Sequence, residues 1–195
     1  MNLALFDFDG TISTRDSFVQ FLQQAVGQVR FAVCMTMLLP RVTAYKLELY
    51  PNYRLKEDVL IRLFSDWPLE RLQRHVREYD RNVLPGIIRA GAMERIAWHK
   101  KKGDAVVIVS ASLEVIVQPW CQRNDLALLA TQLEVIDNRV TGRLKGRNCW
   151  GREKVHRVRS RYDLDEVDDI YAYGDSKGDR AMLEMASHSF YRPFH

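Results

Sequence analysis

Cysteine is scarce in this chain of 195 residues, and its three cysteines follow no recognisable pattern. Cys34, Cys121 and Cys149 are odd in number and far apart, which excludes a disulfide framework and gives no spacing typical of a metal site. Buried free thiols in a reducing compartment are therefore expected. The five histidines show no ligand spacing either, and we assign no role to them.

Long hydrophobic runs are also missing. A membrane-spanning helix needs about 20 apolar residues, whereas the longest apolar stretch after the first strand, Phe31–Leu39, is followed by Pro40 and Arg41. Asp7 and Asp9 interrupt the first apolar run, so a secretory signal peptide is not expected. These absences predict a cytoplasmic protein in which Phe31–Leu39 forms a buried helix. A helix lying at a membrane interface is the alternative.

Charge of one sign is concentrated in a single tract. Between Arg139 and Arg161 there are nine Lys or Arg residues and one acid, Glu153, in a chain whose net charge is only +4. Such a tract can attract an anionic substrate, a phospholipid headgroup or a nucleic acid, and a solvated surface explains it equally well. Aromatic residues that could stack on bases are limited there to Trp150 and Tyr162, so no nucleic-acid partner is expected.

Strands that alternate with helices predict an α/β fold with a doubly wound, mainly parallel sheet. Leu3–Asp9, Ala105–Val109 and Ile170–Tyr173 are the expected core strands, and residues 127–144 contain two β-like runs, as in a hairpin. The expected helices cover residues 87–102, 113–123, 151–162 and 179–186. Apolar residues make up 47% of the chain, which is enough for a packed core.

A different pattern separates the first strand from the rest. From residue 16 to residue 83 apolar side chains recur three and four positions apart, and Pro40, Pro51 and Pro68 punctuate the segments. The region has the size of a small helical module. We therefore predict an α/β core formed by residues 1–15 and 84–195, and an inserted all-helical cap domain formed by residues 16–83.

Polar side chains stand where the predicted strands end. Asp7 and Asp9 lie on one face at the end of the first strand, Ser110 ends the second, and Asp175 follows the last. In doubly wound sheets the chemistry gathers at the carboxyl ends of the strands, so these residues are expected to meet at one edge. Two carboxylates this close repel each other unless a cation compensates.

This set of groups suits the hydrolysis of a phosphate monoester. Asp7 would attack phosphorus to form an acyl-phosphate, and Asp9 would protonate the leaving group and later activate water. Mg²⁺, held by the Asp7 and Asp175 carboxylates and by Asp9 through its backbone carbonyl, would offset the negative charge. Ser110, with backbone N–H groups at the next helix terminus, and Lys154 would bind the phosphoryl oxygens.

Both phosphate ligands have rivals in the sequence. Ser112 is close to Ser110, and either serine could instead be a helix N-cap. Arg152 and Arg157 flank Lys154, although the compact ammonium of a lysine suits a phosphoryl group.

Four segments, DFDGT at 7–11, VIVSAS ending at 112, Lys154 and GDSKGD at 174–179, resemble the ordered motifs of the haloacid dehalogenase superfamily of phosphohydrolases. The helical insert resembles a type C1 cap, as in the subfamily of phosphoserine phosphatases and bacterial phosphatidylglycerophosphate phosphatases. The resemblance implies a phosphate site of Gly10, Thr11, Ser110, Ala111 and Lys154, a metal site of Asp7, Asp9 and Asp175, and supporting roles for Ser176 and Asp179. A threonine after the glycine also argues against dehalogenation.

The sequence departs from phosphoserine phosphatases at two places. Gly178 stands where they usually have a phosphate-contacting asparagine, and Asp16 stands where they tend to place a glutamate that binds the substrate amine. We expect a Mg²⁺-dependent, phosphoserine phosphatase-like hydrolase of a small phosphorylated metabolite.

Alternatives to a metabolite phosphatase follow from other parts of the chain. The apolar stretch Phe31–Leu39 and the basic tract favour a lipid phosphate at the membrane surface, with peripheral contact through that tract on the inner face. A phospho-accepting regulatory domain also uses an aspartate at a strand end, but Asp9 and the helical insert argue against it. A nucleic-acid-binding protein would instead show binding with a steep dependence on salt.

Overall fold

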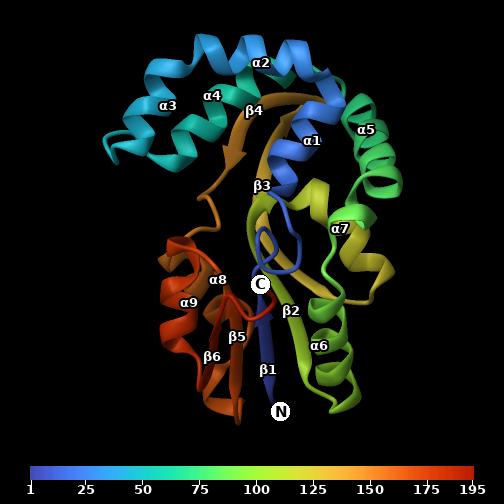
Figure 1. Ribbon diagram of the computed structural model, residues 1–195, viewed down its shortest axis with the longest axis vertical. Helices are drawn as coiled ribbons and strands as arrows, with labels where there is room; N and C mark the ends of the chain where they lie inside the picture. Colours follow the sequence, from blue (N-terminus) through green and yellow to red (C-terminus); the bar gives the residue numbers. More distant parts are fainter.

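The computed structural model describes residues 1–195 as one sheet flanked by helices, with a helical cap at one end (Figure 1). The strand order is β4-β3-β2-β1-β5-β6, and every neighbouring pair is parallel except the antiparallel hairpin β3–β4. The strands are β1 (Leu3–Phe6), β2 (Ala105–Leu113), β3 (Ala127–Ile136), β4 (Arg139–Lys145), β5 (Ile170–Gly174) and β6 (His188–Tyr191). The predicted α/β fold is confirmed.

The central strand β1 is buried along its whole length, because helices cover both faces of the sheet. Ala4 and Phe6 belong to the larger hydrophobic cluster on one face, and Leu3 and Leu5 to the smaller cluster on the other. Helices α6 (Ala90–Lys101) and α7 (Glu114–Arg123) pack into the larger cluster, and α8 (Arg152–Arg161) and α9 (Arg180–Met185) into the smaller one. Short 3₁₀ turns cover Leu84–Ile87, Leu164–Glu166 and Lys177–Asp179.

Five helices between β1 and β2 form the cap, which lies beyond the carboxyl ends of the parallel strands (Figure 1). They are α1 (Ser17–Val26), α2 (Gln28–Met37), α3 (Leu39–Lys46), α4 (Asn52–Phe64) and α5 (Leu69–Asn82). These helices fall within the range 16–83 that the sequence pattern predicts for the insert.

The β3–β4 hairpin reaches into the cap. The N–H of Asp66 donates to the carbonyl of Val140 over 2.8 Å, and the N–H of Val140 donates to the carbonyl of Trp67 over 2.9 Å. At Gly142, φ is +83° and a Cβ would lie 2.5 Å from the Cα of Ile61, so only glycine lets the strand approach α4 this closely. Residues 127–145, which the sequence pattern groups with the core, therefore also support the cap.

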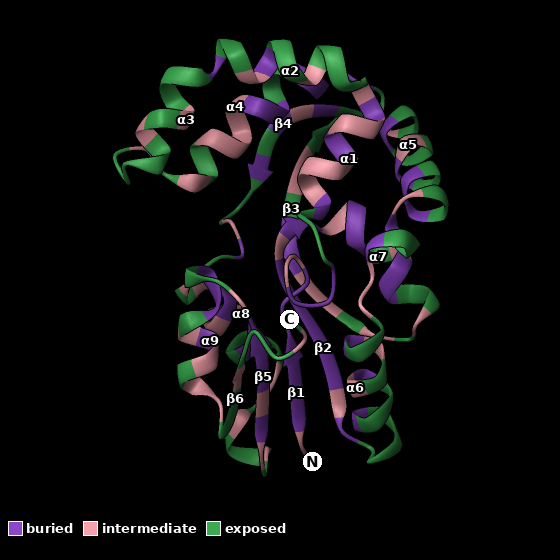
Figure 2. Ribbon diagram, viewed as in Figure 1, coloured by how far each residue is buried: buried purple, intermediate pink, exposed green.

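The stretch Phe31–Leu39 does not form the expected buried helix, and that prediction is wrong. Cys34 and Leu38 are buried, but Val33, Met37 and Leu39 are exposed, and α2 is largely coloured as exposed (Figure 2). Pro40 does not end the helical region either, because it lies in the first turn of α3, where its missing N–H costs nothing. No helix of the chain is both long enough and apolar enough to span a bilayer.

Candidate active site

Asp7 lies directly after β1 and is held by a lysine from a remote segment. The ammonium of Lys154, at the start of α8, donates to Asp7 Oδ1 over 2.5 Å, to Asp179 Oδ1 over 2.6 Å and to the carbonyl of Val109 over 2.7 Å. Burial disfavours the charged lysine, but the attraction of Asp7 and Asp179 outweighs that effect and raises the pKa of Lys154. The lysine is therefore a permanent cation.

A single ammonium does not balance the carboxylates around it. Oxygen atoms of Asp7, Asp175 and Asp179 all lie within 4.8 Å of one another. Burial raises the pKa of Asp7 well above its usual value, and Lys154 offsets this only in part. If all three carboxylates are ionised, the ammonium, which contacts Asp7 and Asp179, balances only one of the three negative charges. The Oδ1 atom of Asp175 is buried without a hydrogen-bond partner. A hard divalent cation with oxygen ligands fits this cluster.

Gly10 allows Asp175 to approach the loop after β1. Its φ is +82°, and a Cβ at this position would lie 2.3 Å from Asp175 Oδ2. A side chain is therefore excluded by both the backbone conformation and the contact. The neighbouring Thr11 hydroxyl is buried and has no hydrogen-bond partner, but Thr11 does not line the cavity, so its expected contact with phosphate stays a prediction.

Asp179 is held from two sides. Its Oδ2 accepts hydrogen bonds from the Ser176 hydroxyl over 2.7 Å, from the Ser176 N–H over 3.0 Å and from the Asp175 N–H over 3.2 Å. Burial alone would raise the pKa of Asp179, but Lys154 and the Ser176 hydrogen bonds hold it below its ordinary value. Asp179 therefore fixes both Lys154 and the loop that carries Asp175.

The Asp9 carboxyl points away from this cluster and toward the cap. Its Oδ1 accepts a hydrogen bond from the N–H of Ser17, the first residue of α1, over 2.7 Å. Burial raises the pKa of Asp9 to about 7, and repulsion by Asp16 acts in the same direction. A carboxyl group that titrates near neutral pH is suited to proton transfer. The expected metal contact of Asp9 rested on its backbone carbonyl and stays a prediction.

Of the two candidate serines, Ser112 lies at the cavity and Ser110 does not. Ser110 is fully buried, and its Oγ accepts the N–H of Ser112 over 3.0 Å. Ala111 and Ser112 line the cavity above Asp7, and the Ser112 hydroxyl shares a 2.9 Å hydrogen bond with Ser17. The structure thus brings the loop expected to bind phosphate to the site, with Ala111 and Ser112 at the cavity although Ser112 is itself buried. The assignment of Ser110 as a phosphate ligand stays a prediction.

The rivals of Lys154 do not reach the carboxylates. The guanidinium of Arg157 is bound to Glu153 and to the carbonyls of Ala130 and Arg147, and Arg152 is exposed. Of the three candidates, Lys154 is the one that contacts the carboxylates.

Lys56 of α4 is a site residue that the sequence does not reveal, because a single lysine in a helical pattern carries no signal. Its ammonium donates to the carbonyl of Ala111 over 2.5 Å and to Asn148 Oδ1 over 3.2 Å. Burial lowers the pKa of Lys56 to about 8, against the opposing attraction of Asp16 and Asp9. It links the cap to the loop that follows β2.

At Gly178, where phosphoserine phosphatases usually have an asparagine, a neighbouring side chain fills the space. A Cβ on Gly178 would lie 2.5 Å from Nε1 of Trp150, so the indole ring fills the space beside the glycine. Trp150 also lines the cavity.

A cavity of about 370 Å³ joins these groups and has two unlike ends. Asp7, Asp9, Lys154, Asp175, Ser176 and Asp179 line the end at the sheet. The cap wall is mainly apolar and consists of Phe18, Val19, Leu22, Phe31, Met35, Leu55 and Val59, with Asp16, Tyr45, Asn52 and Lys56 as its polar members. A ligand held here would have a strongly polar reacting group and a partly apolar body.

Carboxylates at the carboxyl edge of a parallel sheet, with a buried lysine between them, define a class of hydrolases. The family model of the haloacid dehalogenase-like hydrolases matches residues 4–184, and this chain belongs to that family.

Two relatives and a solved structure extend the comparison. Protein CicA of Caulobacter vibrioides is 33% identical over 194 residues, covering 98% of this chain and 86% of the relative. A probable phosphatase of Mycobacterium tuberculosis is 28% identical over 192 residues, covering 95% of this chain and 67% of the relative. The solved phospho-aspartyl intermediate analogue of phosphoserine phosphatase shares the fold, with a TM-score of 0.67 at 21% identity over 97% of this chain and 85% of that one. The chain is a phosphatase.

Proposed function

We propose that this phosphatase hydrolyses phosphate monoesters in a Mg²⁺-dependent reaction through an aspartyl-phosphate on Asp7. Asp7 Oδ1 is bound by Lys154, and the other carboxylate oxygen remains for attack on phosphorus. Lys154 fixes the direction of the nucleophile and keeps it close to a positive charge. The Asp7 and Asp175 carboxylates and the backbone carbonyl of Asp9 would hold Mg²⁺, with Asp179 beside them, and Mg²⁺ when bound neutralises charge on the phosphoryl oxygens.

The proton transfers fall to Asp9. In its protonated form it donates to the oxygen of the leaving alcohol, and as the resulting carboxylate it takes a proton from the water that hydrolyses the acyl-phosphate. The observation that carries this proposal is a carboxyl group with a pKa of about 7, two residues from a lysine-bound carboxylate.

For the substrate we propose a small phosphorylated metabolite that is enclosed between the sheet and the cap. The support is the size of the cavity and the polar pair Asp16 and Lys56 on its cap wall. The pair could bind opposite charges on the leaving group, as phosphoserine carries. A lipid phosphate is the second candidate, since most of the cap wall is apolar and favours an aliphatic body.

The test uses p-nitrophenyl phosphate with Mg²⁺ or with EDTA. We expect Asp7→Asn to abolish turnover. Asp9→Asn should lower it by about 10² to 10⁴-fold, the usual contribution of a general acid or base, here through loss of the base that activates water, because p-nitrophenolate leaves without a proton. Asp125→Asn, on an exposed carboxylate, is the matched control and should keep full activity. When the reaction with an ester radiolabelled at phosphorus is quenched with acid, the label should remain covalently attached to the wild-type protein but not to Asp7→Asn. Wild-type turnover by Asp7→Asn would contradict the mechanism.

Substrate choice is tested separately with phosphoserine, other small phosphate esters, and phosphatidylglycerophosphate in mixed micelles. A preference for phosphatidylglycerophosphate over the small esters would favour a lipid phosphate as the substrate. No turnover of any ester in the presence of Mg²⁺ would overturn both.

A further inference from the structure

The outer surface of the cap is unusual for a water-facing helix. Helix α2 carries apolar residues at every fourth position, and Val29, Val33 and Met37 are 48% to 80% exposed. Leu39, which follows at the start of α3, is 58% exposed. The Thr36 hydroxyl donates to the carbonyl of Ala32 over 2.9 Å, so the hydroxyl is already satisfied by the backbone. We call the set Val29, Val33, Met37 and Leu39 the α2 face.

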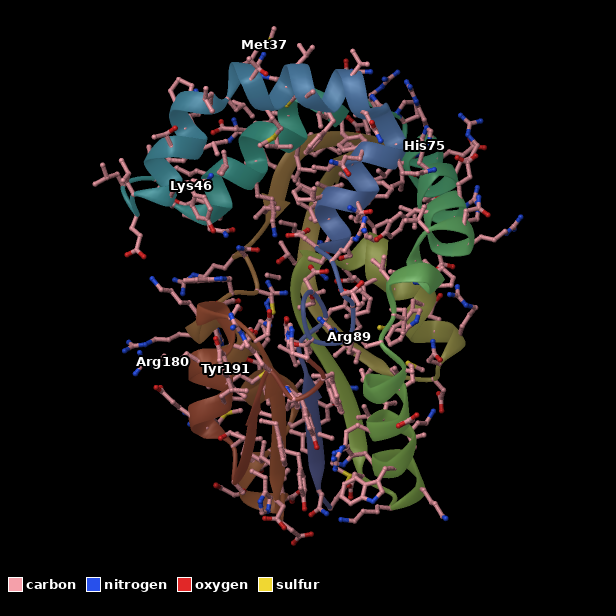
Figure 3. The ribbon with its side chains drawn as sticks, viewed as in Figure 1. Met37, Lys46, His75, Arg89, Arg180 and Tyr191 are labelled. Carbon is pink, nitrogen blue, oxygen red and sulfur yellow. The ribbon has the colours of Figure 1, made fainter.

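Another helix of the cap provides the comparison. The exposed residues of α5 are polar or charged, namely Glu70, Arg71, Gln73, Arg74, Arg77, Glu78, Arg81 and Asn82. The α2 face instead leaves four large apolar side chains in water, and Met37 lies at the outer margin of the cap in Figure 3. Contiguous exposed apolar side chains mark an interaction site.

The segment that carries the α2 face contains cations and no acid. From Ser17 to Leu47 the chain contains Arg30, Arg41 and Lys46 but no Asp or Glu. Of the acids near this segment, Asp16 caps α1, Glu48 is paired with Lys177 at 2.5 Å, and Asp58 is paired with Arg41 at 2.6 Å. The guanidinium of Arg62, from α4, contacts the sulfur of Met37 over 3.1 Å and adds a cation at the face.

The opposite side of α2 belongs to the cavity. Phe31 and Met35 lie two positions from Val33, which turns them about half a helical turn away, and both line the cavity wall. The α2 face and the active-site cavity are therefore separated by the width of a single helix.

We propose that the α2 face docks onto an anionic lipid bilayer. Apolar side chains flanked by cations, with no acid among them, match a surface that offers acyl chains beneath negative headgroups. A second copy of the chain fits this charge pattern less well, because a two-fold contact through the face would bring Arg30 of one copy near the cations of the other. The inference does not depend on the catalytic proposal.

The experiment is sedimentation of the full chain with vesicles of phosphatidylcholine alone or mixed with phosphatidylglycerol. We expect binding to the mixed vesicles only, weakening as salt is added. Arg30→Glu should weaken binding by more than tenfold, because it removes one cation and adds an anion at the surface. The double variant Val33→Asp with Met37→Asp should lose binding.

Control variants separate a loss of membrane docking from misfolding and from a loss of catalysis. The double variant Val135→Asp with Ile136→Asp places the same two charges on exposed apolar residues of the hairpin and should bind like the wild type. Turnover of p-nitrophenyl phosphate should be equal in all of these variants, which shows that they are folded, and Asp7→Asn should bind vesicles normally. Equal vesicle binding by the double variant, or no binding by the wild type, would overturn the proposal. So would a wild-type dimer in sedimentation velocity that the double variant dissociates.

Discussion

Gly10→Ala tests the close approach between the first loop and Asp175. The methyl carbon would lie 2.3 Å from Asp175 Oδ2, whereas real Cβ atoms essentially never come closer than 3.0 Å. Asp175 must then move by about 0.7 Å, and misplacement on the order of 1 Å at a reacting site can lower the rate by about 100-fold. The left-handed backbone at φ +82° adds strain of about 1 to 2 kcal/mol.

Gly103→Ala separates these two effects. Gly103 has φ +78°, but a methyl group added there would meet no atom within 4 Å, so it shares the backbone strain without the contact. In urea unfolding we expect both variants to lose about 1 to 2 kcal/mol, with a further loss for Gly10→Ala alone. In the Mg²⁺-dependent assay only Gly10→Ala should lose activity. Equal activity in the two variants would refute the idea that Asp175 must sit against the Gly10 loop.

Three further expectations follow from the site. For alkyl phosphates, kcat/KM should fall as the pH rises through about 7, because Asp9 must be protonated to donate; a pH profile that is unchanged in Asp9→Asn would contradict this. Lys154→Met should destabilise the metal-free protein by about 3 to 5 kcal/mol in urea, because it leaves Asp7 buried without its cation. Gly178→Asn should displace the indole of Trp150 and shift its fluorescence, and it should lower activity. The double variant Gly178→Asn with Trp150→Gly should regain that activity, because the smaller residue leaves room for the asparagine.

Sequence patterns predicted the part of the site that the sheet builds. Asp7, Lys154 and Asp175 come from three remote segments, and they meet because parallel strands place their carboxyl ends at one edge. Strand β6 was missed, because the four residues of His188–Tyr191 form no apolar run.

The part built by the cap was not predictable in the same way. Lys56 reaches Ala111, and Ser17 holds Asp9, only because of how α4 and α1 are seated over the sheet. Helical periodicity shows which face of a helix is apolar, but it does not show which neighbour covers that face. For the same reason Phe31–Leu39 was expected to be buried, while Val33 and Met37 lie open to solvent.

The hydrophobic core runs without a break from the sheet into the cap. Phe6 and Ile108 of the sheet belong to the same buried cluster of 31 residues as Phe21, Leu60 and Tyr79 of the cap. Two parts that share one core lose their packing together, so calorimetry should record a single cooperative melting transition. If the cap were excised as a fragment, its members of this cluster, among them Phe21, Leu60 and Tyr79, would lose the sheet residues that cover them, and we expect that fragment not to fold alone.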